Sequence, residues 1–150
     1  MGKDGFRYLM VRIGEVGCLI DLSSIVEIRE EIAELLDLSK NDQRFGIVGA
    51  MNFRQTRIPA VDPGLHLNLG LKTAPENRTA LILKSPEGNW ALLVDRVDKI
   101  CPHDRLASCD IPPLLKEASL GCYMKIGLIQ EEPMVVLNPE QFYGSAVAVA

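Results

Sequence analysis

The apolar residues of this chain come in short runs that are bounded by glycine, proline or asparagine, and this spacing favours β-strands over long helices. The clearest case is residues 79–83 (Thr-Ala-Leu-Ile-Leu) and 90–94 (Trp-Ala-Leu-Leu-Val), which flank the turn sequence Ser-Pro-Glu-Gly-Asn at residues 85–89. Two such runs around a turn predict a β-hairpin. The chain is 47% hydrophobic but only 5% aromatic, so its core must be built mainly from aliphatic side chains.

Further hairpins are predicted on both sides of this one. Apolar runs separated by turn residues lie at 6–13 and 18–20, at 46–53 and 58–61, and at 123–129 and 133–137. Each pair predicts two antiparallel strands joined by a short loop. The chain should therefore be mainly β.

Other local signals predict one more strand and two short helices. Residues 25–28 (Ile-Val-Glu-Ile) predict a strand, and residues 32–36 (Ile-Ala-Glu-Leu-Leu) have helical character and high helix propensity. Asp62 followed by Pro63 is typical of an N-cap and a first helical residue. Pro59 cannot donate a hydrogen bond to a sheet, so we expect it at an edge or at the start of a strand.

The two halves of the chain resemble each other weakly. Pro59 and Pro133 each lie in the second strand of a predicted hairpin, and each is followed by a capping residue and a second proline, at 62–63 and at 138–139. This repetition predicts two similar β lobes, small barrels or a sandwich, with short helices.

Length and charge limit the class of protein. The 150 residues suit one domain, with a core at about residues 6–143 and a frayed tail at 144–150. Lys+Arg 16 against Asp+Glu 20 gives a net charge of −4 without a long basic block, so nucleic acid is not an expected partner. The first residues lack the apolar run of a signal peptide, and no stretch approaches the roughly 20 apolar residues of a membrane span. We expect a cytoplasmic protein with reduced cysteines.

Residues that could carry chemistry are few. His66 lies on the predicted helical turn and is expected to be exposed. Cys101, His103, Cys109 and Cys122 are the candidates for a soft-metal site, although their spacing matches no zinc knuckle and buried cysteines behave as small hydrophobes. No phosphate-binding loop or nucleophile–base set stands out. We expect a non-enzyme without catalytic residues, metal or cofactor, and a small metal or redox protein is the alternative from another class.

Three segments, in this order, resemble the CheW family of chemotaxis adaptors. Residues 25–29 (Ile-Val-Glu-Ile-Arg) are similar to the family's Val-x-Glu-Ile-Arg strand. Residues 49–62 are similar to its signature Gly-x-x-Asn-Leu-Arg-Gly-x-x-(Ile/Val)-Pro-(Ile/Val)-Val-Asp-Leu, and residues 90–97 resemble Gly-(Ile/Leu)-x-Val-Asp-x-Val. The resemblance spans about residues 6–143. It implies two five-stranded SH3-like barrels that share one hydrophobic core.

The resemblance also implies two partners, neither of them a nucleic acid or a membrane. One is a CheA-type histidine kinase, whose regulatory domain would dock on Ile25, Glu27, Ile28 and Arg54. Ile25 and Ile28 fit core positions equally well, and an ordinary exposed turn arginine is the alternative for Arg54.

The second implied partner is the cytoplasmic tip of a methyl-accepting chemotaxis receptor. Val94 and Val97 would flank its groove near the lobe junction, although their apolar character equally fits core packing. Asp95, between them, is expected to orient a turn.

The sequence departs from the family pattern at two positions. Gln55 stands in place of the turn glycine, and Pro63 in place of the leucine after Asp62. A glycine reaches positive φ without strain, so this turn is either strained or of a changed type. An adaptor for another kinase pathway, such as pilus motility or gene regulation, is therefore an alternative within the same fold.

Overall fold

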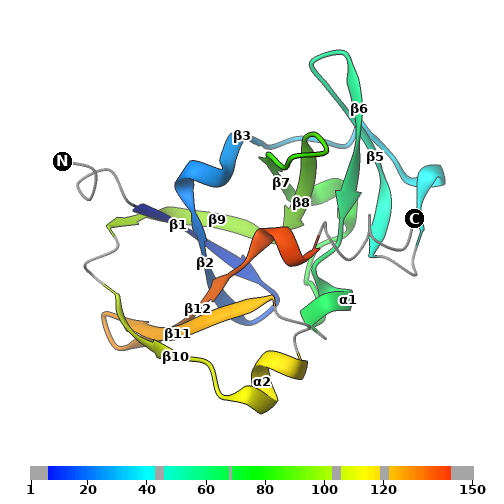
Figure 1. Cartoon of the computed structure of the whole chain (residues 1–150). Coiled ribbons are helices and arrows are strands. Elements are labelled where there is room, and N and C mark those ends of the chain that lie inside the picture. Colours follow the sequence, from blue (N-terminus) through cyan, green and yellow to red (C-terminus); the bar gives the residue numbers. More distant parts are fainter. Residues whose placement is uncertain (1–6, 43–45, 68, 103–105, 119–121, 143–150) are drawn as a thin grey trace.

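The computed structural model describes residues 7–42, 46–67, 69–102, 106–118 and 122–142, and shows two β-sheets lying side by side (Figure 1). The first sheet has the order β10-β11-β12-β2-β1-β9 and the second has the order β3-β7-β8-β6-β5-β4. The first sheet consists of β1 (Arg7–Ile13), β2 (Val16–Asp21), β9 (Arg96–Pro102), β10 (Ala107–Asp110), β11 (Tyr123–Ile129) and β12 (Glu132–Leu137). The second consists of β3 (Ile25–Arg29), β4 (Leu36–Asp37), β5 (Ile47–Phe53), β6 (Thr56–Val61), β7 (Thr79–Leu83) and β8 (Trp90–Val94).

Helices are short and lie in the connections. They are α1 (Gly64–Leu67), α2 (Pro113–Ala118) and the 3-10 turns Leu22–Ser24, Leu38–Lys40 and Pro75–Asn77. The Asp62 carboxylate accepts a hydrogen bond from the Gly64 amide at 2.7 Å, which confirms the capping role predicted for it. Within the described residues, none of the helices is long and apolar enough to cross a membrane. The expected tail at 144–150 lies outside the described residues.

The two sheets repeat one pairing pattern. In the second sheet β5 and β6 form a hairpin and β6 runs parallel to β8, while in the first sheet β11 and β12 form a hairpin and β12 runs parallel to β2. β3 follows β2 in the chain but pairs with β7, and β9 follows β8 but pairs with β1. Each sheet thus receives an edge strand from the hairpin of the other. The mainly β prediction with two similar lobes is confirmed.

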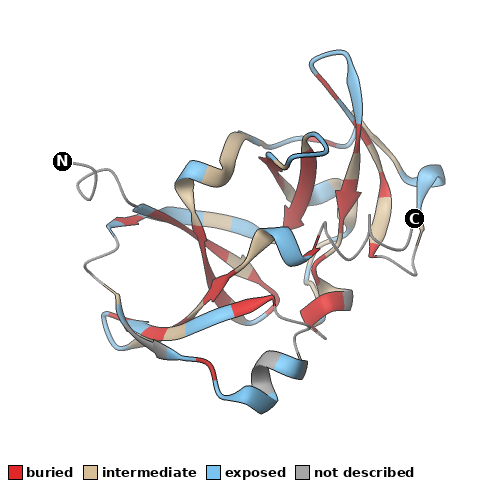
Figure 2. Cartoon of the chain, viewed as in Figure 1, coloured by how far each residue is buried: buried red, intermediate tan, exposed pale blue. Residues whose placement is uncertain are grey.

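One hydrophobic cluster joins the two sheets, and we call it the shared core. It contains Leu9, Val11, Ile13, Cys18, Ile20, Val61, Leu67, Leu81, Leu83, Trp90, Leu92, Val94, Ile111, Cys122, Tyr123, Leu137 and Phe142. Because side chains alternate along a strand, the intervening residues of the same strands face the other way. In β8, Ala91 and Leu93 join a second cluster, and in β1, Tyr8 and Met10 join a third. Both faces of the central strands are buried, which explains their uninterrupted apolar sequences (Figure 2).

Three local predictions were wrong. Residues 33–35 form one turn, with the Leu35 and Leu36 amides donating to the Ile32 carbonyl at 2.9 and 3.0 Å, and β4 begins at Leu36. A run this short cannot offset the cost of starting a helix. Pro59 lies inside β6, an interior strand, although only Ala60 and Val61 pair with β8.

The third wrong prediction is the exposure of His66, which is buried, with 4% of its surface accessible. Its ring lies 5.1 Å from the ring of Phe142, and Gly46 approaches it closely. Both neighbours are distant in the sequence, so the local pattern around His66 carried no sign of them.

The turn that contains Gln55, which stands in place of the family's turn glycine, is strained. Arg54 and Gln55 have φ values of 51° and 66°, and Gln130 and Glu131 in the equivalent β11–β12 turn have 52° and 68°. Positive φ at both central residues is the pattern of a type I′ hairpin turn, which favours asparagine and glycine. The chain places four longer side chains there, at a cost of order 1 kcal/mol for each such residue.

Replacing Gln55 with glycine should therefore raise the free energy of unfolding by about 0.5 kcal/mol, because relief of the φ strain exceeds the added flexibility of the unfolded chain. Glu131→Gly, at the same place in the other hairpin, should give a similar gain. Thr56→Gly, one residue later in β6, should instead lose about 0.5–1 kcal/mol. Urea unfolding of the three variants provides the measurement. A loss of stability in Gln55→Gly would show that the glutamine side chain contributes more than the strain removes.

Candidate functional site

The edge strand β3 meets the tip of the β5–β6 hairpin through an ion-pair cluster. The Glu27 carboxylate forms ion pairs with Arg29 Nη1 at 2.8 Å and with Arg54 Nη2 at 3.3 Å. The Arg54 guanidinium also lies 4.7 Å from the centre of the Phe53 ring, a cation–π distance. The hydrogen bond from Arg29, with the nearby charge of Arg54, lowers the pKa of Glu27. Glu27 thus fixes the direction of an arginine that is 27 positions away in the sequence and 67% exposed.

The two isoleucines of β3 differ in their surroundings. Ile28 is 40% exposed and stands beside the ion-pair cluster in the strand, whereas Ile25 packs partly buried against the shared core. Because β3 pairs only with β7, its other edge is unpaired by any described strand. Glu27 and Arg54 are joined by the ion pair at this open edge, and Ile28, the next residue of β3, is exposed on the opposite face of the strand. We call these three residues the β3–tip surface. Ile25 packs inward, against the shared core.

The two valines predicted for the receptor groove also differ. Val94 has an accessible surface of 0% and belongs to the shared core. Val97 lies on the edge strand β9, half-buried, and packs against the same core. Val94 has no exposed surface from which to contact a partner, so any part it has in a groove is support from within. Val97 is accessible at the lobe junction.

Asp95 joins three segments at this end of the junction. Its carboxylate accepts hydrogen bonds from the Gly14 amide at 2.7 Å, from the Lys72 amide at 3.0 Å, and from the amide and hydroxyl of Thr73 at 3.0 and 2.7 Å. Burial alone would raise the pKa of Asp95, but the hydrogen bonds from Thr73, Gly14 and Lys72 outweigh it and the pKa is lowered. Asp95 thus fixes the turn between β1 and β2 against the end of β8.

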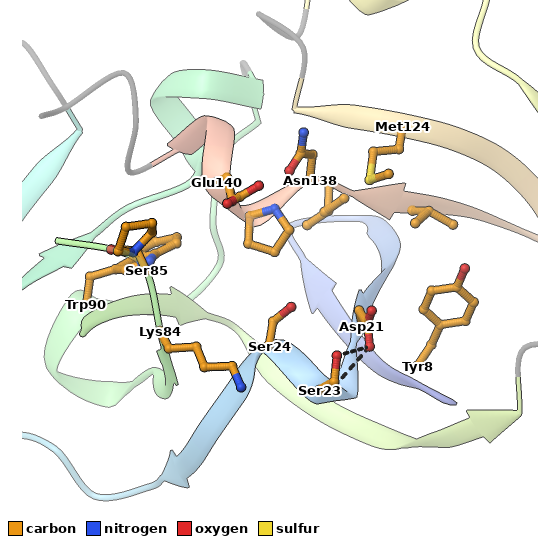
Figure 3. A pocket seen from close by; sticks show the side chains of 14 residues that line it. Tyr8, Asp21, Ser23, Ser24, Lys84, Ser85, Trp90, Met124, Asn138 and Glu140 are labelled. Carbon is orange, nitrogen blue, oxygen red and sulfur yellow. Dashed lines mark hydrogen bonds between the residues drawn. The ribbon is translucent and has the colours of Figure 1, made fainter. Parts of the chain in front are cut away.

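A hollow of about 590 Å³ opens at the opposite end of the junction (Figure 3). Tyr8 and Met124 line it from the first sheet, and Trp90 from the second. Charged groups also line it, namely Asp21, Lys84 and Glu140. We call it the junction pocket. The junction pocket was not predictable from the sequence, because its walls come from segments that are far apart in the chain.

Of the four alternative metal ligands, the two whose side chains the structure describes, Cys101 and Cys122, lie in different clusters. Cys122 belongs to the shared core, whereas Cys101 belongs to the cluster on the other face of the first sheet. His103 and the side chain of Cys109 lie outside the described residues. Burial raises the pKa of Cys122, and that of the core residue Cys18, to about 12, so both are protonated small hydrophobes at neutral pH.

The described residues thus form two sheets that share one core, with an ion-paired strand edge open at β3. The chain belongs to the family of CheW-like domains, whose model matches residues 7–146. Members of this family are non-catalytic scaffold adaptors of chemotaxis-type signalling, and the resemblance found in the sequence is confirmed.

A solved structure supports the fold. The crystal structure of the scaffolding protein TtCheW from Thermoanaerobacter tengcongensis superposes with a TM-score of 0.72, covering 89% of this chain and 88% of that one at 15% sequence identity. A comparison with curated proteins found no match. The two chains thus share the arrangement of their strands although few of their residues are identical.

Proposed function

We propose that this protein is a cytoplasmic adaptor that couples methyl-accepting chemotaxis receptors to a CheA-type histidine kinase. The observation that supports it most is the β3–tip surface, where the Glu27–Arg54 ion pair lies at the open edge of β3 and the next residue, Ile28, exposes apolar area. All three residues are candidates from the sequence. The kinase would dock there, and the receptor tip would bind at the lobe junction beside Val97.

The β3–tip surface has the features of a docking site. Ile28 offers apolar area, and the Arg54 guanidinium offers several hydrogen-bond donors in a fixed fork that suits a carboxylate on a partner. The bond to Glu27 and the contact with Phe53 restrict the arginine before binding, so less side-chain entropy is lost on docking. The surface is thus pre-organised for one orientation of a partner.

Arg54→Glu should weaken binding of the kinase regulatory domain by about tenfold, because it replaces the donor fork with a carboxylate beside Glu27. The melting temperature should change little, since exposed ion pairs contribute about 0–1 kcal/mol. Calorimetric titration against the kinase domain provides the measurement. Arg96→Glu is a matched control: Arg96 is also 67% exposed and ion-paired, but lies on β9. Equal affinities for the Arg54 and Arg96 variants would remove the tip from the interface.

Co-purification from the native host tests the proposal as a whole. Recovery of a CheA-type kinase and a methyl-accepting receptor with the tagged wild-type protein is the expected result. Recovery of a different histidine kinase would instead assign the adaptor to another pathway. The Arg54→Glu variant should lose the kinase and keep the receptor, since the two partners bind to separate surfaces.

A further inference from the structure

A buried histidine contacts the last helical residues of the described chain. His66 on α1 is 4% exposed, and its ring packs against the ring of Phe142 with the planes tilted by 59°. Gly46, at a φ of 74°, leaves the space that the imidazole fills, because a Cβ there would lie 2.9 Å from His66 Cε1. Within the described part of the chain, His66 Nδ1 has no hydrogen-bond partner. The site therefore suits a neutral ring and offers no acceptor for a second N–H.

Phe142 connects this histidine to the junction pocket. Residues 139–142 are helical and follow β12 after Asn138, and Phe142 is fully buried in the shared core. Asn138, Pro139 and Glu140 form one wall of the pocket (Figure 3). Because Pro139, Glu140 and Phe142 belong to one helical turn, we expect a displacement of Phe142 to shift this wall.

The charged groups around His66 do not compensate a positive charge on its ring. Asp62 is the carboxylate whose charge acts on His66, but its Oδ2 lies 3.2 Å from Arg78 Nη1 and its Oδ1 accepts from the Gly64 amide. Arg78, with a side chain 6% exposed, brings a second positive charge to the same cluster. On the helical segment that packs against His66, the charged residue is Glu140, which is exposed and lines the pocket.

We propose that His66 is an acid-sensitive latch, which when neutral holds residues 139–142 against the shared core and when protonated releases them and reshapes the junction pocket. Burial of an uncompensated imidazolium costs more than its attraction to the Phe142 ring returns, so protonation favours a state in which the imidazole leaves its site and the ring contact is lost. The inference rests on the geometry of α1 and the terminal helical turn, and it stands whether or not the proposed partners are correct.

The direction of the pKa agrees with this geometry. Burial lowers the pKa of His66 and the Asp62 charge only partly opposes it, so the folded value lies below the unfolded value of about 6.5. The latched form is therefore fully favoured above about pH 6.5, and loses stability as the pH falls from there through the folded pKa.

Trp90 lines the junction pocket and is the only tryptophan of the chain, so its fluorescence reports the pocket directly. We would follow the NMR titration of His66 Cε1–H and the Trp90 emission between about pH 5 and 8, with far-ultraviolet circular dichroism to detect global unfolding. The expected result is one common midpoint below the unfolded value for both signals, without loss of the β signal. A Trp90 emission that stays flat while His66 titrates would overturn the latch, and so would a change that coincides with unfolding.

Two variants separate the histidines. The Trp90 response should be lost in His66→Gln, which keeps polarity but cannot titrate, and should persist in His103→Gln, which removes the other histidine of the chain. A response that persists in His66→Gln or disappears in His103→Gln would contradict the proposal. If His66→Gln does not fold, the comparison of the two midpoints in the wild-type protein decides alone: equal midpoints support the latch and different midpoints overturn it.

Discussion

Asp95→Ala should lower the free energy of unfolding by about 3 kcal/mol, the largest loss of stability that we expect from an acidic residue of this chain. The carboxylate accepts hydrogen bonds from three backbone amides and one hydroxyl, which belong to two other segments of the chain. Hydrogen bonds to a charged group contribute about 1.5–3 kcal/mol each, though not additively, and the partly buried amides of Gly14 and Thr73 would lose their acceptor. Chemical unfolding measured on the variant and the wild type gives the difference.

Asp98→Ala is the matched control for this effect. Asp98 lies three residues further on, and its carboxylate is ion-paired to Arg12 at 3.1 Å and Arg96 at 2.8 Å. It holds side chains rather than backbone amides, so its removal should cost less than about 1 kcal/mol. Similar losses for Asp95→Ala and Asp98→Ala would mean that the three segments are held together by packing alone.

The Asp95 carboxylate should also make the stability of the protein fall as the pH is lowered. Because the folded pKa of Asp95 is lowered, its contribution is complete above the unfolded value of about 3.9 and is lost as the pH falls through the folded value. Asp95→Asn, which has no proton to gain, should lose less stability than the wild type between about pH 5 and 2.

The hairpins were predictable because their signals are local. A turn sequence such as Ser-Pro-Glu-Gly-Asn lies next to both strands that it joins, and β7 and β8 form as expected. The exchange of β3 and β9 between the sheets was not predictable from the residues, because nothing in an edge strand's own sequence states which hairpin it will pair with. The alternation of Leu81 and Ile82 between two clusters was hidden for a similar reason, since a strand buried on both faces shows no polar side.

In the candidate site, too, the sequence indicated single residues but not which of them lie close together. The resemblance supplied Glu27 and Arg54, but their ion pair depends on the distance between two segments that only the fold sets. Val94 and Val97 were indistinguishable in the sequence and differ in the structure, because one lies in the central strand β8 and the other on the edge strand β9. The burial of His66 escaped prediction, since Gly46 and Phe142, which cover its ring, are far from it in the sequence.

Val97→Arg should reduce receptor affinity by at least tenfold while the protein stays folded. Val97 is half-buried on an edge strand, so a longer side chain can extend its charge to solvent, whereas its charge at the junction would oppose burial of an apolar receptor helix. Loss of a central anchor of this kind typically costs about 2 kcal/mol of binding energy. Val94→Arg, which places the same charge in the shared core, should fail to fold.

Binding of a receptor fragment in membrane nanodiscs, together with circular dichroism, separates these outcomes. Leu128→Arg is the control: Leu128 is 49% exposed on β11, in the same sheet as Val97 but away from β9, and should leave the affinity unchanged. If Val97→Arg unfolds as Val94→Arg does, Val97 is a core residue. If it folds and binds like the Leu128 variant, the receptor does not use the β9 side of the junction, and the junction pocket lined by Trp90 becomes the next surface to test.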